Sequence, residues 1–214
     1  MPNWYNNSIT LKHKDPAMIE RAVKAYQEGR FLAEFIPVPQ ELKDTVAGFK
    51  PEDEREAHEA QQKSNLEKFG YKDWYSFCVN EWGTKWDIGG GGEFIEQPDA
   101  NTLEASFDSA WSPPCAAYEK LAAMGFEIKA YYMETGMAFC GKWTGNEDDS
   151  FDDYYEYGSE TAETIREAVG AELDDFWGLT DMLSEWEAQE DEVDDTQELI
   201  DELDRIRKLG PHTD

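Results

Sequence analysis

Apolar and polar positions follow the same order in two separate stretches of this chain. In the first stretch, residues 8–12 alternate like a half-buried strand, and Asp15 and Pro16 are residue types that begin helices. Apolar residues then recur at helical spacing until Gly29, a typical helix stop. The pattern predicts, in order, a strand over residues 7–12, a helix over 16–28 and a strand over 31–36.

The second stretch repeats this order about a hundred residues later. Residues 103–107 alternate, Pro113 and Pro114 fit the start of a helix, and Gly125 fits its end. The predicted elements are a strand over residues 103–109, a helix over 113–124 and a strand over 126–133. A hairpin from Tyr131 to Trp143 would add one more strand.

Two such units predict an α+β fold of the ferredoxin-like, split β-α-β type. In this fold an antiparallel sheet carries both helices on one face. Between the units, residues 50–83 read as a helical insertion, and residues 84–88 read as a strand that runs into four glycines. We therefore expect a ferredoxin-like domain over residues 1–158 and an acidic helical extension over 159–214.

The extension has an amphipathic helical pattern. Its apolar residues form two stripes at helical spacing: Leu173, Phe176, Trp177, Leu183 and Trp186 in the first, and Leu199, Leu203 and Ile206 in the second. Stripes this short need a surface to pack against. We expect them to pack on the domain or on a second copy of the chain, which would make a homodimer.

Charge is distributed unevenly along the chain. Residues 147–214 contain 25 Asp and Glu and four Lys and Arg, whereas residues 1–146 have a net charge of only −8. A protein that needed acids only for solubility would spread them over its whole surface. One strongly acidic segment instead favours an element that meets a basic partner.

Composition excludes several classes of function. The three cysteines are odd in number and have no C-x-x-C spacing, which argues against a zinc site or a disulfide framework. Three cysteines are also too few for an iron–sulfur cluster with four cysteine ligands. The three histidines lack metal-ligand spacing, and no nucleophile motif occurs. The pI near 4.2 disfavours direct binding to nucleic acid or anionic lipid. We expect a cytoplasmic protein without a membrane span, metal, cofactor or enzymatic activity.

Aromatic residues supply the best candidate for a pocket. Its members are Asn3, Trp4, Trp82, Lys85, Trp86 and Trp111. Two interpretations stay open for the tryptophans, because large aromatic residues either pack in the core or form a ligand platform. Lys85 is expected on a different face from the tryptophans, either in a surface ion pair or in contact with an anion.

Several of these motifs resemble the ferredoxin-like domain proteins of phages and conjugative plasmids, often labelled YubB-like. The matching segments, which span roughly residues 1–143, include Met1-Pro2-Asn3-Trp4, Trp82-Gly83-Thr84-Lys85-Trp86-Asp87 and Ala110-Trp111-Ser112-Pro113-Pro114. In that family "ferredoxin" names the fold and not a cluster. The resemblance implies a mobile-element origin and brings no catalytic residues, and the acidic extension lies outside it.

The spacing of acids suggests a specific use for the extension. One carboxylate per roughly 2.7 residues on a helix gives about one charge per 4 Å, close to the spacing of about 3.4 Å between phosphates of a DNA strand. The leading hypothesis is a phage or plasmid DNA mimic that blocks a basic host enzyme, such as a defence nuclease. The acids expected to face the partner are Asp174, Asp175, Glu187, Glu190, Asp191, Asp194, Asp195, Glu198, Asp201 and Glu202.

Two alternatives remain beside this anti-defence hypothesis. The acids could be only the solvated face of helices that complete the fold, in a non-catalytic interaction domain. The chain could also be a small-ligand binder or an enzyme that uses the tryptophan motifs. A mimic needs its carboxylates on one continuous surface, whereas an enzyme needs a concave site with convergent polar groups.

Overall fold

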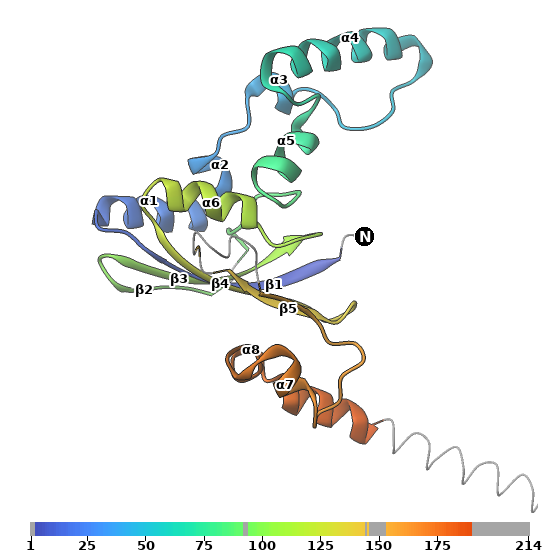
Figure 1. Ribbon diagram of the computed structural model, residues 1–214. Coiled ribbons are helices and arrows are strands. Elements are labelled where there is room, and N and C mark those ends of the chain that lie inside the picture. Colours follow the sequence, from blue (N-terminus) through green and yellow to red (C-terminus); the bar gives the residue numbers. More distant parts are fainter. Residues whose placement is uncertain (1–2, 92–93, 144, 146–152, 190–214) are drawn as a thin grey trace, which may run out of the picture. The chain divides into compact units, whose positions relative to one another are not determined.

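The computed structural model describes residues 3–91, 94–143, 145 and 153–189 (Figure 1). The chain divides into two units, Met1–Tyr154 and Tyr155–Asp214. Each unit is considered by itself below.

The first unit is built on a sheet whose central strand is the first one in sequence. Its strands are β1 (Trp4–Lys12), β2 (Ile95–Asp99), β3 (Thr102–Ala110), β4 (Glu127–Glu134) and β5 (Phe139–Trp143), and β6 (Asp153–Glu156) spans the boundary between the units. The order of the strands is β2-β3-β1-β4-β5-β6. Strand β1 pairs antiparallel with β3 and β4, so that Asn7 lies between Phe107 and Tyr132. The order of the first four strands is that of a split β-α-β sandwich, which confirms the predicted fold class.

Two helices, α1 (Pro16–Gln27) and α6 (Cys115–Ala123), lie on the same face of the sheet (Figure 1). The carboxylate of Asp15 accepts a hydrogen bond of 3.0 Å from the backbone N–H of Ala17, as the predicted cap requires. Ala22 and Leu121 bring the buried sides of the two helices into one apolar cluster with residues of the sheet. The predicted hairpin is confirmed by the antiparallel pairing of β4 with β5.

The strand predicted over residues 31–36 is wrong, because this segment forms the helix α2 (Phe31–Phe35). Phe31, Leu32 and Phe35 are all buried, a spacing that fits one side of a short helix. The returning strand of the first β-α-β unit is β2, more than sixty residues later. Strand β2 is mostly exposed and contains Pro98, so it lacks the alternation that marks a half-buried strand.

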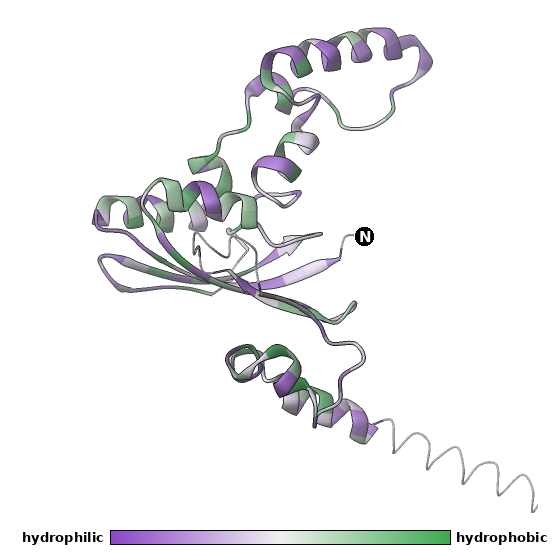
Figure 2. Ribbon diagram, viewed as in Figure 1, coloured by the Kyte–Doolittle hydropathy of each residue, from purple (hydrophilic) through white to green (hydrophobic). Residues whose placement is uncertain are grey.

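The helical insertion therefore lies inside the first β-α-β unit, before β2, and three helices follow α2 there. They are α3 (Gln40–Lys43), α4 (Glu52–Phe69) and α5 (Trp74–Glu81). Helix α4 is predominantly hydrophilic along its length (Figure 2), and its one buried residue is Asn65. Asp73 and Ser76 form a capping box that begins α5.

The strand predicted over residues 84–88 is also absent, and the segment instead crosses the molecule as irregular backbone. It ends at Gly89, whose φ of +92° and close approach to α1 leave no room for a side chain. A Cβ atom there would lie 2.2 Å from the carbonyl oxygen of Tyr26. Packing against α1 therefore replaces pairing with a strand.

The second unit is helical, with α7 (Ile165–Val169), α8 (Ala171–Trp177) and a further helix from residue 179 to the end of the described residues at 189. Of the first predicted stripe, Leu173 and Leu183 are buried, whereas Phe176 and Trp186 are exposed. The second stripe, Leu199, Leu203 and Ile206, lies outside the described residues. No helix in the described ranges has both the length and the apolar character needed to cross a membrane.

Candidate functional site

The segment 82–87, Trp-Gly-Thr-Lys-Trp-Asp, organises the surface that the sequence singled out. Its first residue, Trp82, is not part of a pocket, because its side chain is only 4% exposed and belongs to the core cluster. The indole Nε1–H donates a 3.0 Å hydrogen bond to the carbonyl oxygen of Ile36. Of the two interpretations given to the tryptophans, core packing holds for Trp82.

Two further residues of this segment, Thr84 and Asp87, are fixed by polar contacts. The Thr84 hydroxyl donates a 2.9 Å hydrogen bond to the Ala110 carbonyl oxygen at the end of β3. The Asp87 carboxylate accepts hydrogen bonds from the backbone N–H groups of Leu32 (2.6 Å) and Ala33 (3.0 Å), and so binds the start of α2. Burial raises the pKa of Asp87, although these N–H donors act in the opposite direction. The segment is thus anchored on both sides of Lys85 and Trp86.

Lys85 lies between two indole rings. Its Nζ atom is 4.6 Å from the centroid of the Trp86 ring and 4.5 Å from that of the Trp111 ring. The expectation that Lys85 faces away from the tryptophans is therefore wrong, because the long side chain folds back over both rings. Each contact of this cation–π type contributes about 0.5–1 kcal/mol at an exposed site. No carboxylate among the described residues lies within ion-pair distance of Lys85.

The backbone of Trp111 adopts an unusual conformation. Its φ is +76°, a region that bulky side chains avoid at a cost of about 1–3 kcal/mol. The conformation is held by its N–H, which donates a 2.9 Å hydrogen bond to the carbonyl oxygen of Asn3, and by the neighbouring Ser112, whose hydroxyl donates to the Gly83 carbonyl oxygen. This strained turn places the indole of Trp111 at the surface beside Lys85.

Two further rings extend this surface. Trp4 lies 5.6 Å from Trp86 between ring centroids, and Tyr75 of α5 meets Trp111 edge-on at 5.5 Å. We call the set Trp4, Tyr75, Lys85, Trp86 and Trp111 the aromatic face. Trp4, Trp86 and Trp111 are 48%, 40% and 44% exposed, so the aromatic face presents apolar rings to solvent that a monomeric protein would normally bury.

Asn3 does not join the aromatic face through its side chain, which donates instead to the sulfur of Met137 at 3.0 Å. Sequence reasoning missed Tyr75, because nothing in the pattern of α5 distinguishes an exposed ring from a core ring. A shallow depression of about 300 Å³ lies beside Trp4 and Trp86, with the carboxylates of Asp87 and Asp108 in its wall. Asp108 already accepts a 2.8 Å hydrogen bond from Asn6.

Two of the three cysteine thiols are buried, those of Cys78 and Cys140. Burial raises the pKa of Cys78 and of Cys140 to about 12, so both stay protonated at neutral pH. No group of three or more metal-binding side chains occurs in the part of the chain that the structure describes.

The acids of the second unit that were predicted to face a partner differ from one another in burial. Asp174 is only 3% exposed, and its carboxylate accepts 2.8 Å hydrogen bonds from Arg166 Nη1 and from the backbone N–H of Thr180. Burial raises the pKa of Asp174, but the Thr180 N–H and the Arg166 guanidinium outweigh it and hold the pKa below its usual range. The assignment of Asp174 to a partner surface is therefore wrong, because this carboxylate joins α8 to the next helix.

Asp175 and Glu187 do lie at the surface. Asp175 also accepts from Arg166, and Glu187 accepts a 2.8 Å hydrogen bond from the backbone N–H of Ala162. The other predicted acids lie outside the described residues: Glu190, Asp191, Asp194, Asp195, Glu198, Asp201 and Glu202.

Net charge in the described part of the second unit is nevertheless strongly negative. Residues 155–189 contain ten acids and one base, Arg166. Arg166 is already bound to both Asp174 and Asp175. Eight acids are exposed: Glu156, Glu163, Glu167, Glu172, Asp175, Asp181, Glu185 and Glu187. We call this set the acidic surface.

Comparison with known proteins places the chain in a family. A family model described as "Ferredoxin-like domain in Api92-like protein" matches residues 82–201, from Trp82 into the second unit. A crystal structure of the protein api92 from Yersinia pseudotuberculosis is 14% identical, with a TM-score of 0.41, over 74% of this chain and 99% of that chain. A search of curated proteins found no match. Because the family model covers more than half of its length, this chain belongs to the family of Api92-like proteins with a ferredoxin-like domain.

Proposed function

We propose that this chain is a non-enzymatic binding protein whose acidic surface occupies the nucleic-acid-binding site of a basic protein. The observation that carries the proposal is the charge of residues 155–189, where eight acids are exposed and the one base is bound by two carboxylates. Such a surface attracts a basic groove over a Debye length of about 8 Å at physiological salt. Because the sequence resembles phage and plasmid proteins, the partner that we propose is a defence nuclease of the host.

The helical structure of the second unit supports this proposal. Leu173, Leu179 and Leu183 are buried, so six of the eight exposed acids, from Glu167 to Glu187, are attached to helices with an apolar side. Carboxylates held in place lose less conformational entropy on binding than those of a disordered tail, which favours tighter binding to the same groove.

The test is competition with DNA. The full chain is added to cleavage assays of a panel of restriction and CRISPR nucleases at low and at physiological salt. We expect inhibition of at least one nuclease, weakening as salt rises. A variant with Glu163→Gln, Glu167→Gln, Asp181→Asn and Glu185→Gln should inhibit about tenfold less well or worse.

A matched control separates the acidic surface from overall charge. Glu20→Gln, Glu56→Gln, Glu67→Gln and Glu119→Gln remove the same number of exposed carboxylates from the first unit. Inhibition by this control should change by about twofold or less. Equal loss in both variants, or no inhibition of any nuclease by the unaltered chain, would count against the proposal.

The aromatic face supports a second candidate function, as a contact surface for a protein partner. Tryptophan and tyrosine are enriched at the centres of protein interfaces. Here three exposed tryptophans lie together, and one of them is held by a strained backbone. Trp86→Ala should then weaken partner binding while the protein stays folded. Leu66→Ala, at an exposed apolar residue of α4, should leave partner binding unchanged.

A further inference from the structure

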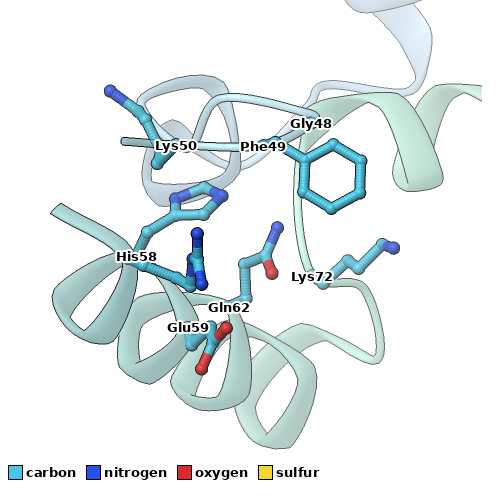
Figure 3. Close-up of a pocket in the computed structure, with 8 residues that line it drawn as sticks. Gly48, Phe49, Lys50, His58, Glu59, Gln62 and Lys72 are labelled. Atoms are coloured by element: carbon cyan, nitrogen blue, oxygen red, sulfur yellow. The ribbon is translucent and has the colours of Figure 1, made fainter. Parts of the chain in front are cut away.

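The first unit has a cavity that neither the charge pattern nor the tryptophan motifs indicated. It has a volume of about 570 Å³, within the range of about 300–1,000 Å³ that is typical of small-molecule sites. The loop before α4, the first turns of α4 and the loop before α5 line it, and it is open to solvent on one side (Figure 3). Its lining residues are Gly48, Phe49, Lys50, Arg55, His58, Glu59, Gln62 and Lys72.

The charge of this cavity is opposite to that of the chain. Three lining residues are basic and one is acidic, although the whole chain has a net charge of −29. Lys50 pairs with Glu54 at 2.9 Å. Arg55 and Lys72 have no ion pair with any described residue. Unpaired cations beside one cavity repel each other, so an anion bound between them would be stabilised.

Two neighbouring groups indicate more than a simple anion. Phe49 is fully exposed to solvent although it borders the cavity, and its ring lies across the cavity from His58 (Figure 3). The Nε2 atom of His58 is enclosed, and no hydrogen-bond partner for it exists in the described part of the protein. A flat ring would cover Phe49, and a polar group of the same ligand would reach His58 Nε2 once the imidazole turns toward the cavity.

The polar side chains at the floor of the cavity suit hydroxyl or amino groups. Gln62 offers both a donor and an acceptor, and Glu59 offers acceptors only. Both side chains come from the same helix, α4, one turn apart. A ligand that carries an anionic group, a ring and hydrogen-bond donors matches this combination.

The walls of the cavity are held in place by one buried side chain. Asn65 Nδ2 donates hydrogen bonds to Thr45 Oγ1 (2.8 Å) and to the carbonyl oxygen of Lys72 (3.1 Å). Asn65 thereby ties both flanking loops to α4. A cavity fixed before a ligand arrives requires less ordering on binding.

From these observations we infer that the cavity binds a nucleoside monophosphate. The phosphate binds at Arg55, with Lys72 as a second exposed cation of the lining, and the base stacks on Phe49. Arg55 binds phosphate oxygens through a forked pair of N–H donors, and Lys72 adds a second positive charge. This site is separate from the acidic surface and does not depend on the proposed function.

The test is equilibrium binding to the full chain by isothermal titration calorimetry at physiological salt. The probes are AMP, adenosine and inorganic phosphate. We expect AMP to bind about tenfold more tightly than either fragment, because only AMP reaches both the cations and Phe49. Arg55→Gln should weaken AMP binding about tenfold, and Phe49→Ala about fivefold or more.

Lys63→Gln is the matched control, since Lys63 is an exposed cation on α4 that does not line the cavity. It should change AMP affinity by about twofold or less. The inference is overturned if AMP shows no saturable binding at about 10 mM, or if Lys63→Gln weakens binding as much as Arg55→Gln does. Equal affinities for AMP and phosphate would also overturn it, because the ring would then have no contact. Unchanged melting temperatures of the variants would show that they remain folded.

Discussion

Charged residues serve different purposes in the two units of this chain. In the first unit, ion pairs join segments that are distant in sequence, such as Lys120 with Glu81 and Lys68 with Glu41. In the described part of the second unit, Arg166 forms ion pairs with Asp174 and Asp175, which lie within nine residues of it. These acids of the first unit therefore help to hold its helices together, whereas the ion pairs of Asp174 and Asp175 in the second unit are local in sequence.

The apolar residues show the same difference. The main core cluster of the first unit contains 25 buried residues, from the sheet, α1, α6 and the insertion. The described part of the second unit has six buried apolar residues, which are Tyr157, Ile165, Val169, Leu173, Leu179 and Leu183. Repulsion among exposed acids lowers the stability of a folded unit. The partner surface proposed above would account for a charge that opposes the folding of this small core.

The largest effect is expected in the core of the first unit. Trp82→Ala removes a buried indole and leaves the carbonyl oxygen of Ile36 without its hydrogen bond. We expect the free energy of unfolding to fall by about 3–5 kcal/mol, as measured by urea denaturation. A loss below about 1 kcal/mol would show that Trp82 is not a core residue.

A smaller effect is expected for the one structural acid identified in the second unit. Asp174→Ala removes the hydrogen bonds from Arg166 and Thr180, and the free energy of unfolding should fall by about 1–3 kcal/mol. Glu185→Ala, at an exposed acid without a described partner, should change it by about 0.5 kcal/mol or less. Equal losses would remove the distinction between structural and surface acids.

The effect of Asp174→Ala should also depend on pH. The pKa of Asp174 is below its usual range in the folded protein, so the ionised carboxylate favours folding. This contribution is complete above the unfolded pKa of about 3.9 and disappears as the pH falls through the lowered folded pKa. The difference in stability between the unaltered chain and the variant should therefore shrink in acid. A difference that stays constant down to low pH would contradict the role of ionised Asp174.

Much of the fold could be predicted from local patterns. The half-buried strands β1 and β3, with their alternation, and the capped helix α1 were indicated by short-range signals. The helix in the segment 31–36 could not be predicted in this way, because six residues rich in apolar side chains fit a buried strand as well as a short helix. What decides between them is Asp87, which binds the start of α2 from 55 residues away. Such a long-range contact leaves no mark in the local pattern.

Four members of the aromatic face, Trp4, Lys85, Trp86 and Trp111, were named from the sequence, whereas Tyr75 was missed. Trp82 and Trp86 lie four residues apart in one motif, yet one is buried and the other is exposed. Residue type cannot separate a core indole from a surface indole. The cavity at Phe49 was missed because its lining comes from two loops and one helix without a common motif. The one weak indication in the sequence was an aromatic residue, Phe49, next to a basic residue, Lys50.

The smallest expected effect concerns the aromatic face and the backbone strain at Trp111. If the positive φ of Trp111 is a real strain, Trp111→Gly should be more stable than Trp111→Ala by about 0.5–1 kcal/mol, because only glycine adopts this conformation freely. Both variants lose the indole and its contact with Lys85, so that loss cancels in the comparison. Trp86 has no positive φ, so the order should reverse there, with Trp86→Ala more stable than Trp86→Gly. Urea denaturation of the four variants measures both differences. If the Ala variant is more stable than the Gly variant at both positions, the backbone of Trp111 is not strained. The aromatic face would then differ from the acidic surface, where repulsion among the carboxylates lowers the stability of the second unit.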